Sequence, residues 1–84
     1  MSVVRKIVRN SKQLGEGIRA ARLEKSWRQK DLAREASVRQ ASISEIENGV
    51  AKSKFDTVIK LLAVLDLDLA IVSRKKAEFD PTKY

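Results

Sequence analysis

The chain has 84 residues, with 18 Lys and Arg against 11 Asp and Glu, so its net charge is +7. It contains no Cys and no His, which excludes disulfides, thiolate nucleophiles, imidazole bases and the usual zinc sites. This length suits one compact domain, and the charge favours a polyanionic partner such as nucleic acid. We expect no catalytic residue, no metal and no cofactor. The sequence has neither a long apolar run nor a signal-peptide core, so a cytoplasmic protein without a membrane partner is expected.

The first segment, residues 1–10, places Val and Ile among Arg and Lys, which suits either a basic N-terminal arm or a short edge strand. Ser11 is the predicted N-cap of a helix over residues 12–25. Gly15 and Gly17 weaken that helix by about 1 kcal/mol each relative to Ala, and close packing against another helix would explain them. The side chains expected on its inward face are Leu14, Ile18, Ala21 and Leu23.

Two short helices are predicted next, over residues 28–36 and 39–48, joined by the turn Ser37-Val38. The first buries Leu32, Ala33 and Ala36, and Val38 in the turn is also expected to be buried. The second turns Ile43 and Ile46 inward, and leaves Gln40, Ala41, Ser44 and Glu45 on the other side. Asn48-Gly49 supplies the helix stop, because both residue types tolerate left-handed backbone.

A fourth helix is predicted over residues 55–65, with Phe55, Val58, Leu61, Leu62 and Leu65 as its apolar face. After Asp66 the apolar residues alternate, so residues 67–73 are predicted to form one strand. An unpaired apolar strand promotes aggregation, so this strand must pair with residues 3–8 or with its equivalent in a second chain. Residues 74–84 read as a polar, partly flexible C-terminal tail.

The stretch from Trp27 to Gly49 is the sequence form of a helix-turn-helix, whose second helix enters the major groove of DNA by its N-terminal end. The side chains placed to meet base edges are Arg39, Gln40, Ala41 and Ser44. Gln can bond adenine through two atoms, Ala offers a methyl-sized surface to thymine, and Arg reaches a guanine or a phosphate. Glu45 is expected to face solvent or to temper base contacts, and Glu47 to be structural.

A second set of residues is predicted to hold the DNA backbone. Arg28, Gln29 and Lys30 stand at the start of the preceding helix, where free N–H groups favour a phosphate. Asn48, Lys52 and Lys54 lie at the end of the recognition helix and in the loop after it. Each of these residues alone would be an ordinary solvated side chain, and the prediction depends on their order along one face.

The residues shared with a known pattern are Leu14-Gly15, Ile18-Arg19, Arg22, Trp27, Gln29, Leu32-Ala33, Val38, Ile43-Ser44 and Glu47-Asn48-Gly49. As a set they resemble the Xre/phage-repressor helix-turn-helix family. The resemblance implies a mainly α, lambda-repressor-like domain over residues 11–66 and a buried structural ion pair between Arg22 and Glu47. Two residues depart from the family. Ser37 replaces the usual turn Gly, and Arg28 replaces the usual Ser, Thr or Asn cap.

The segments 39–44 and 65–71 further resemble the HipB-type antitoxins. The resemblance implies a homodimer with an intersubunit β-sheet built from residues 67–73, through Leu67, Leu69, Ile71 and Val72. It also implies a HipA-type Ser/Thr kinase toxin as partner, and autoregulation by binding double-stranded palindromic operators. The DNA contacts of such proteins would map onto Lys30, Arg39, Gln40, Ala41 and Ser44.

The main alternative is a stand-alone phage-type repressor without a toxin, which the strand at 67–73 disfavours because many such repressors end in further helices. An enzyme is disfavoured by the absence of His, Cys and a Gly-rich phosphate loop. RNA binding is disfavoured because the chain has only Trp27, two Phe and one Tyr for base stacking.

Overall fold

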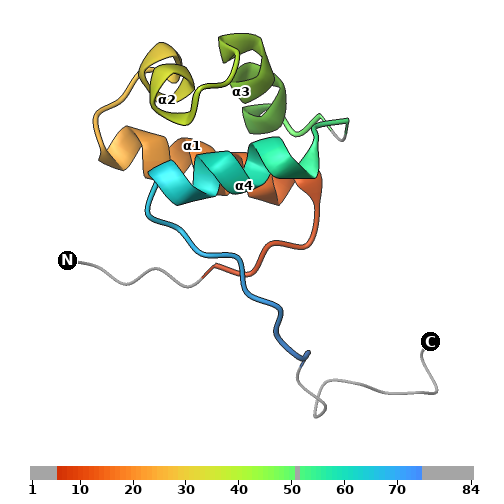
Figure 1. Ribbon diagram of the computed structural model, residues 1–84. Coiled ribbons are helices and arrows are strands. Elements are labelled where there is room, and N and C mark those ends of the chain that lie inside the picture. The colour runs from red at the N-terminus through yellow and green to blue at the C-terminus, as the bar shows by residue number, and fades with distance from the viewer. Residues whose placement is uncertain (1–5, 51, 75–84) are drawn as a thin grey trace.

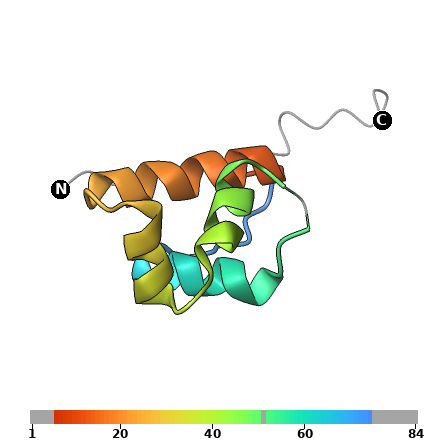
Figure 2. The same cartoon turned by 90° about the horizontal axis from the view of Figure 1, so that it is seen from above.

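The computed structural model describes residues 6–50 and 52–74, and the remainder of the predicted arm and tail lies outside these described residues. Over this part the chain forms α1 (Ser11–Glu24), α2 (Gln29–Ala36), α3 (Gln40–Glu47) and α4 (Phe55–Val64). The mainly α architecture predicted from the sequence is confirmed. α2 and α3 lie together on one side of α1 and α4, as the two perpendicular views show (Figures 1 and 2).

The core takes one fully buried aliphatic side chain from each helix: Ile18, Leu32, Ile43 and Leu61. Around them pack the other apolar residues predicted to face inward, with Val38 and Leu14 only half buried at the margin. Two core predictions are wrong. Leu23 is 51% exposed and Phe55 is 64% exposed.

Helix geometry explains both errors. Leu23 directly follows the inward-facing Arg22, and one residue of an α-helix turns the side chain by about 100° away from that direction. Phe55 is the first residue of α4 and lies beside an apolar groove rather than in the core.

Each of the four helices ends in the same backbone motif, in which one residue adopts a left-handed conformation. These residues are Ser26, Ser37, Gly49 and Asp66, with φ between 56° and 79°. The next N–H then bonds a carbonyl five residues earlier, at 3.2, 3.0, 2.9 and 2.8 Å in chain order. These are Schellman motifs, and the residue after the left-handed one is apolar in every case.

Ser37 adopts the left-handed conformation that Gly usually adopts at this position of the turn. The chain therefore keeps the turn of the family without its Gly. At the end of α3, Gly49 takes the left-handed conformation, and Asn48 stays at φ −88°. The helix stop predicted for the pair is therefore supplied by the glycine alone.

The start of α1 lies one residue earlier than predicted, because Asn10 caps it in place of Ser11. The Asn10 side chain accepts a hydrogen bond from the Gln13 N–H at 2.8 Å, and Gln13 in turn accepts from the Arg9 N–H at 2.7 Å. α2 begins without an N-cap acceptor, since Arg28 has only donors. The Asp31 carboxylate compensates by accepting from the Arg28 N–H at 2.8 Å.

Close packing of α1 against α3 accounts for one of the two glycines in α1. A Cβ at Gly15 would overlap the backbone carbonyl oxygens of Ile46 and Glu47. A Cβ at Gly17 would meet no atom within 4 Å, so packing does not explain that residue.

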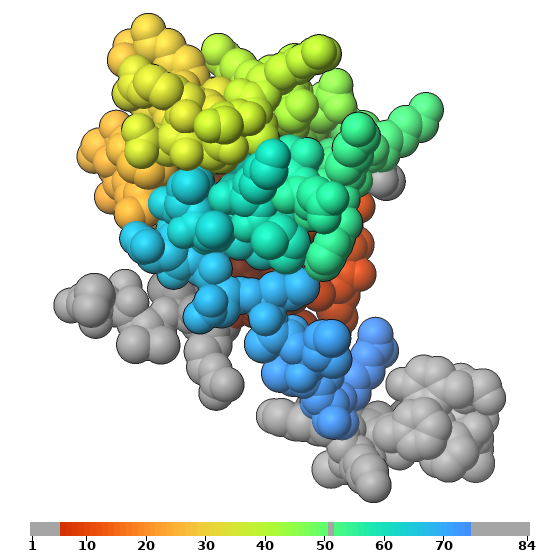
Figure 3. Space-filling view, viewed as in Figure 1, coloured from red at the N-terminus to blue at the C-terminus, as the bar shows by residue number. Residues whose placement is uncertain are grey.

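Residues 67–74 leave the helical body without helix or strand structure, and residues 6–8 likewise have neither (Figures 1 and 3). The strand predicted at 67–73 is therefore not formed within the described part of this single chain. A strand needs a hydrogen-bonding neighbour, and the described residues of the same chain do not supply one to this segment. Among the residues described, no helix has the length and apolarity needed to span a bilayer.

Candidate nucleic-acid interface

α3 separates the predicted base-contacting side chains from the structural ones. Gln40 and Ala41 are exposed and Ser44 is half buried, whereas Ile43 and Ile46 on the other side are buried. The N-cap Arg39 is also exposed, and the first turn of α3 carries no acidic residue. The positive end of the helix is therefore left unopposed by a neighbouring carboxylate and is available to an anion.

Arg22 and Glu47 form a buried, two-point ion pair between α1 and α3. The Arg22 Nε lies 2.7 Å from Glu47 Oε2, and Nη2 lies 3.0 Å from Oε1. Their side chains are only 8% and 3% exposed. The hydrogen bond to Glu47 raises the pKa of Arg22, outweighing the opposite effect of burial. This is the pair that the family resemblance implies.

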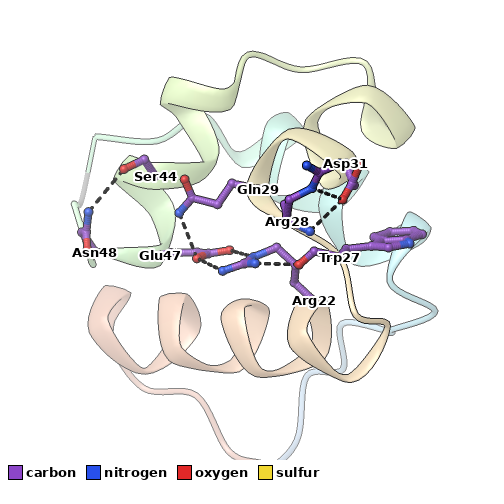
Figure 4. A network of polar contacts seen from close by, with 8 residues as sticks. All are labelled: Arg22, Trp27, Arg28, Gln29, Asp31, Ser44, Glu47 and Asn48. Carbon is purple, nitrogen blue, oxygen red and sulfur yellow. Dashed lines mark hydrogen bonds and ion pairs between the residues drawn. The ribbon is translucent and has the colours of Figure 1, made fainter.

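The same pair also holds the turn between α1 and α2. Arg22 Nη1 donates to the carbonyl oxygen of Trp27 at 2.7 Å. Gln29, at the start of α2, donates its amide Nε2 to Glu47 Oε1 at 3.2 Å. Figure 4 shows the Arg22 and Gln29 side chains, from α1 and α2, converging on the Glu47 carboxylate of α3.

The sequence predicted only a phosphate contact for Gln29, and the structure shows that this side chain also bonds Glu47. Its amide nitrogen still has a second hydrogen, so one side chain can bond Glu47 and a phosphate at the same time. The N–H groups that begin a helix have no acceptor one turn before them, so those at the start of α2 can also donate to a phosphate.

The cationic side chains near α2 and in the loop after α3 differ in their contacts. Arg28 and Arg34 each lie near Asp31, at 3.3 and 3.4 Å. Hydrogen bonds from Arg28 lower the pKa of the Asp31 carboxyl. Lys30, Lys52 and Lys54 are exposed, the last two in the loop that Figure 3 shows at the edge of the helical body.

Asn48 and Ser44, both predicted DNA contacts, touch each other one turn apart on α3. Asn48 Nδ2 donates to Ser44 Oγ at 3.4 Å, which leaves the hydroxyl hydrogen of Ser44 free to donate elsewhere. This contact was not predicted from the sequence, although the spacing of four residues on a helix indicates it. Nor was Arg19 predicted to contact DNA, although it lines an open polar hollow together with Gln29 and Asn48.

The fold and this interface define a helix-turn-helix protein, and the family described as Helix-turn-helix matches residues 18–72. Antitoxin HipB of Escherichia coli (strain K12) is 30% identical over 71 residues, which cover 84% of this chain and 81% of that protein. The chain therefore belongs to the helix-turn-helix family of the HipB antitoxins.

Two solved structures have the same fold. A HipB–O4 20mer complex superposes with a TM-score of 0.78 at 27% identity, covering 84% of this chain and all of that chain. A HipA–HipB–O2–O3 complex gives the same TM-score, identity and coverage.

Proposed function

We propose that this chain is the antitoxin of a HipA-type Ser/Thr kinase toxin and represses its own operon by binding palindromic operator DNA as a homodimer. The proposal rests on the two faces of α3. One face presents Gln40, Ala41 and Ser44 outward, and on the other Glu47 is buried in the ion pair with Arg22. We expect it to act in the cytoplasm, where its DNA is, and by binding rather than by catalysis.

Sequence-specific recognition rests on the outer face of α3. Gln40, the first helical residue, has the donor and acceptor that match the N7 and N6 of adenine. Ala41 beside it suits the methyl group of thymine, and Ser44 offers a free hydroxyl hydrogen. Arg39 extends the same edge toward a guanine or a phosphate.

Contacts to the DNA backbone would fix the register of that helix. We assign them to the start of α2 and to the end of α3 with its following loop, on both sides of the base-reading face. The side chains are Arg28, Gln29, Lys30, Asn48, Lys52 and Lys54. They are exposed except for the half-buried Gln29, and most are cationic, so they would neutralise phosphates and release counterions.

The dimer is assigned to the segment that leaves the helical body. Leu69, Ile71 and Val72 are 56%, 99% and 55% exposed, and Leu67 is 37% exposed. Apolar residues at this exposure favour pairing with a second chain, in which residues 67–73 of two copies would form the intersubunit sheet. Leu67, Leu69 and Val72 also line the apolar groove beside α1 and α4, so the groove would take part in the same contact.

The kinase partner is supported by the family and by the HipA–HipB–O2–O3 complex, in which a related protein is bound with HipA. One experiment tests the whole proposal: co-expression with the product of the adjacent gene, followed by pull-down and by binding to DNA from upstream of the operon. Co-purification and tight operator binding are expected. Operator binding without any kinase partner would instead identify a stand-alone repressor.

A further inference from the structure

An ion pair joins the ends of two helices that lie 41 residues apart in the sequence. Lys25 follows α1, and its Nζ lies 2.9 Å from Oδ2 of Asp66, which follows α4. The same ammonium group lies 5.3 Å from the centroid of the Trp27 ring, within the range of a cation–π contact. One lysine thus holds both the α1–α2 turn and the end of α4.

Asp66 is the residue at which the chain changes direction and leaves the domain. Its φ of 59° is left-handed, its N–H bonds the carbonyl of Ala63 at 3.2 Å, and the Leu67 N–H bonds Leu62 at 2.8 Å. Asp tolerates this conformation better than most residues that have a side chain. The orientation of Asp66 therefore sets the direction in which residues 67–73 leave.

From Lys25 the contacts continue to the recognition helix. The carbonyl of Trp27 accepts from Arg22, and Arg22 holds Glu47 in the last turn of α3. The departing segment and α3 are thus connected by a series of contacts: the Lys25–Asp66 ion pair, the cation–π contact of Lys25 with Trp27, and the hydrogen bonds of Arg22.

We propose that Lys25 and Asp66 are positioning residues that set the spacing between the two recognition helices of the dimer, and so the operator half-site spacing that the protein accepts. The inference rests on the proposed function, since it needs a dimer joined through residues 67–73. In such a dimer the angle at which this segment leaves each domain fixes how far apart the two copies of α3 lie. Paired half-sites must match that distance along the duplex.

The size of the effect follows from the exposure of the pair. The side chains of Lys25 and Asp66 are 31% and 81% exposed, and exposed ion pairs have small, salt-screened energies. We expect the preference for the best spacing over one changed by a base pair to fall about two- to fivefold when the pair is broken. High salt should move the wild-type protein toward the same reduced preference.

The test uses Lys25→Met, which keeps an apolar stem over Trp27, and Asp66→Asn, which keeps tolerance of the left-handed backbone. Affinity is measured by fluorescence anisotropy on the best palindrome, on palindromes with one base pair inserted or deleted, and on a single half-site. Lys60→Met on α4 is the control for Lys25→Met, because Lys60 is exposed and its loss lowers the net charge by the same amount.

In both variants we expect a reduced spacing preference with unchanged half-site affinity, and no further reduction in the double variant. Lys60→Met should keep the wild-type preference. Variants that remain dimers with the full wild-type preference overturn the inference and leave the proposed function intact. A wild-type protein that is monomeric, or that has no spacing preference, overturns the proposed function and the inference with it.

Discussion

Breaking the Arg22–Glu47 pair from one side should be far more damaging than removing it entirely. In Glu47→Ala the guanidinium of Arg22, whose side chain is 8% exposed, loses its carboxylate, and Gln29 loses its acceptor. A buried charge left without its partner costs about 3–5 kcal/mol. At about 0.05–0.15 kcal/mol per residue, a domain of this size has about 4–13 kcal/mol of stability in total. The single variant should therefore lose between about a quarter and all of that stability.

The double variant Arg22→Met, Glu47→Leu removes both charges and fills the space with apolar atoms. It should be more stable than Glu47→Ala, and close to the wild type, because neither residue then leaves a buried ion unpaired. Urea unfolding followed by Trp27 fluorescence and circular dichroism measures all three proteins, with comparison at equal slope. Glu45→Ala is the matched control, since Glu45 is exposed one turn after Ala41 and should change stability by less than about 0.5 kcal/mol.

Two results would refute this reasoning. A loss below about 1 kcal/mol in Glu47→Ala would mean that the pair is not buried in solution as it is in the structure. A double variant less stable than the single one would mean that Arg22 stabilises the fold chiefly through the Trp27 carbonyl, whose hydrogen bond the double variant also removes.

Four other variants probe separate parts of the molecule. Gln40→Ala should lose about 1–3 kcal/mol of operator affinity in anisotropy titrations, with little change in affinity for random DNA, and equal losses on the two DNAs would exclude base contact by Gln40. Lys52→Ala should weaken binding to operator and random DNA alike, and should reduce the slope of log affinity against log salt by about one. Ser37→Gly should stabilise the domain by about 0.5–1 kcal/mol in urea unfolding, because the left-handed backbone costs Ser more than Gly, and a loss would contradict that balance. The folded Asp31 carboxyl has a lowered pKa because of its hydrogen bonds from Arg28, so the unfolded chain takes up more protons and stability falls as pH drops below about 4. Asp31→Asn should flatten that fall in acid unfolding curves, and an unchanged curve would show that other carboxylates dominate.

The helices and most of the core could be predicted because their signals are local and periodic. Ile18, Leu32, Ile43 and Leu61 each belong to a set of apolar residues at helical spacing within one segment, and each is fully buried. The division of α3 was predictable for the same reason. The cap of α1 was harder to place, because Asn10 and Ser11 are both good capping residues and only the reach of a side chain to Gln13 decides between them.

Contacts between distant parts of the chain had no periodic signal. The Lys25–Asp66 pair joins two turns, and the Gly15 contact depends on how closely α1 approaches the backbone of α3. The hydrogen bond from the Gln29 amide to Glu47 likewise depends on three-dimensional packing. The predicted strand at 67–73 depends on a neighbouring strand, which the described residues of one chain do not supply.

The four Schellman motifs have a consequence for how fast the domain forms. Each helix end is defined by hydrogen bonds within six residues, so the turns can form before distant parts of the chain meet. Helical domains built from such local contacts fold in about microseconds to milliseconds. The helical domain of a newly made chain would then fold well before the chain meets a second copy or DNA. Stopped-flow or temperature-jump fluorescence of Trp27, which packs beside the core directly after one of these motifs, would follow that process in real time.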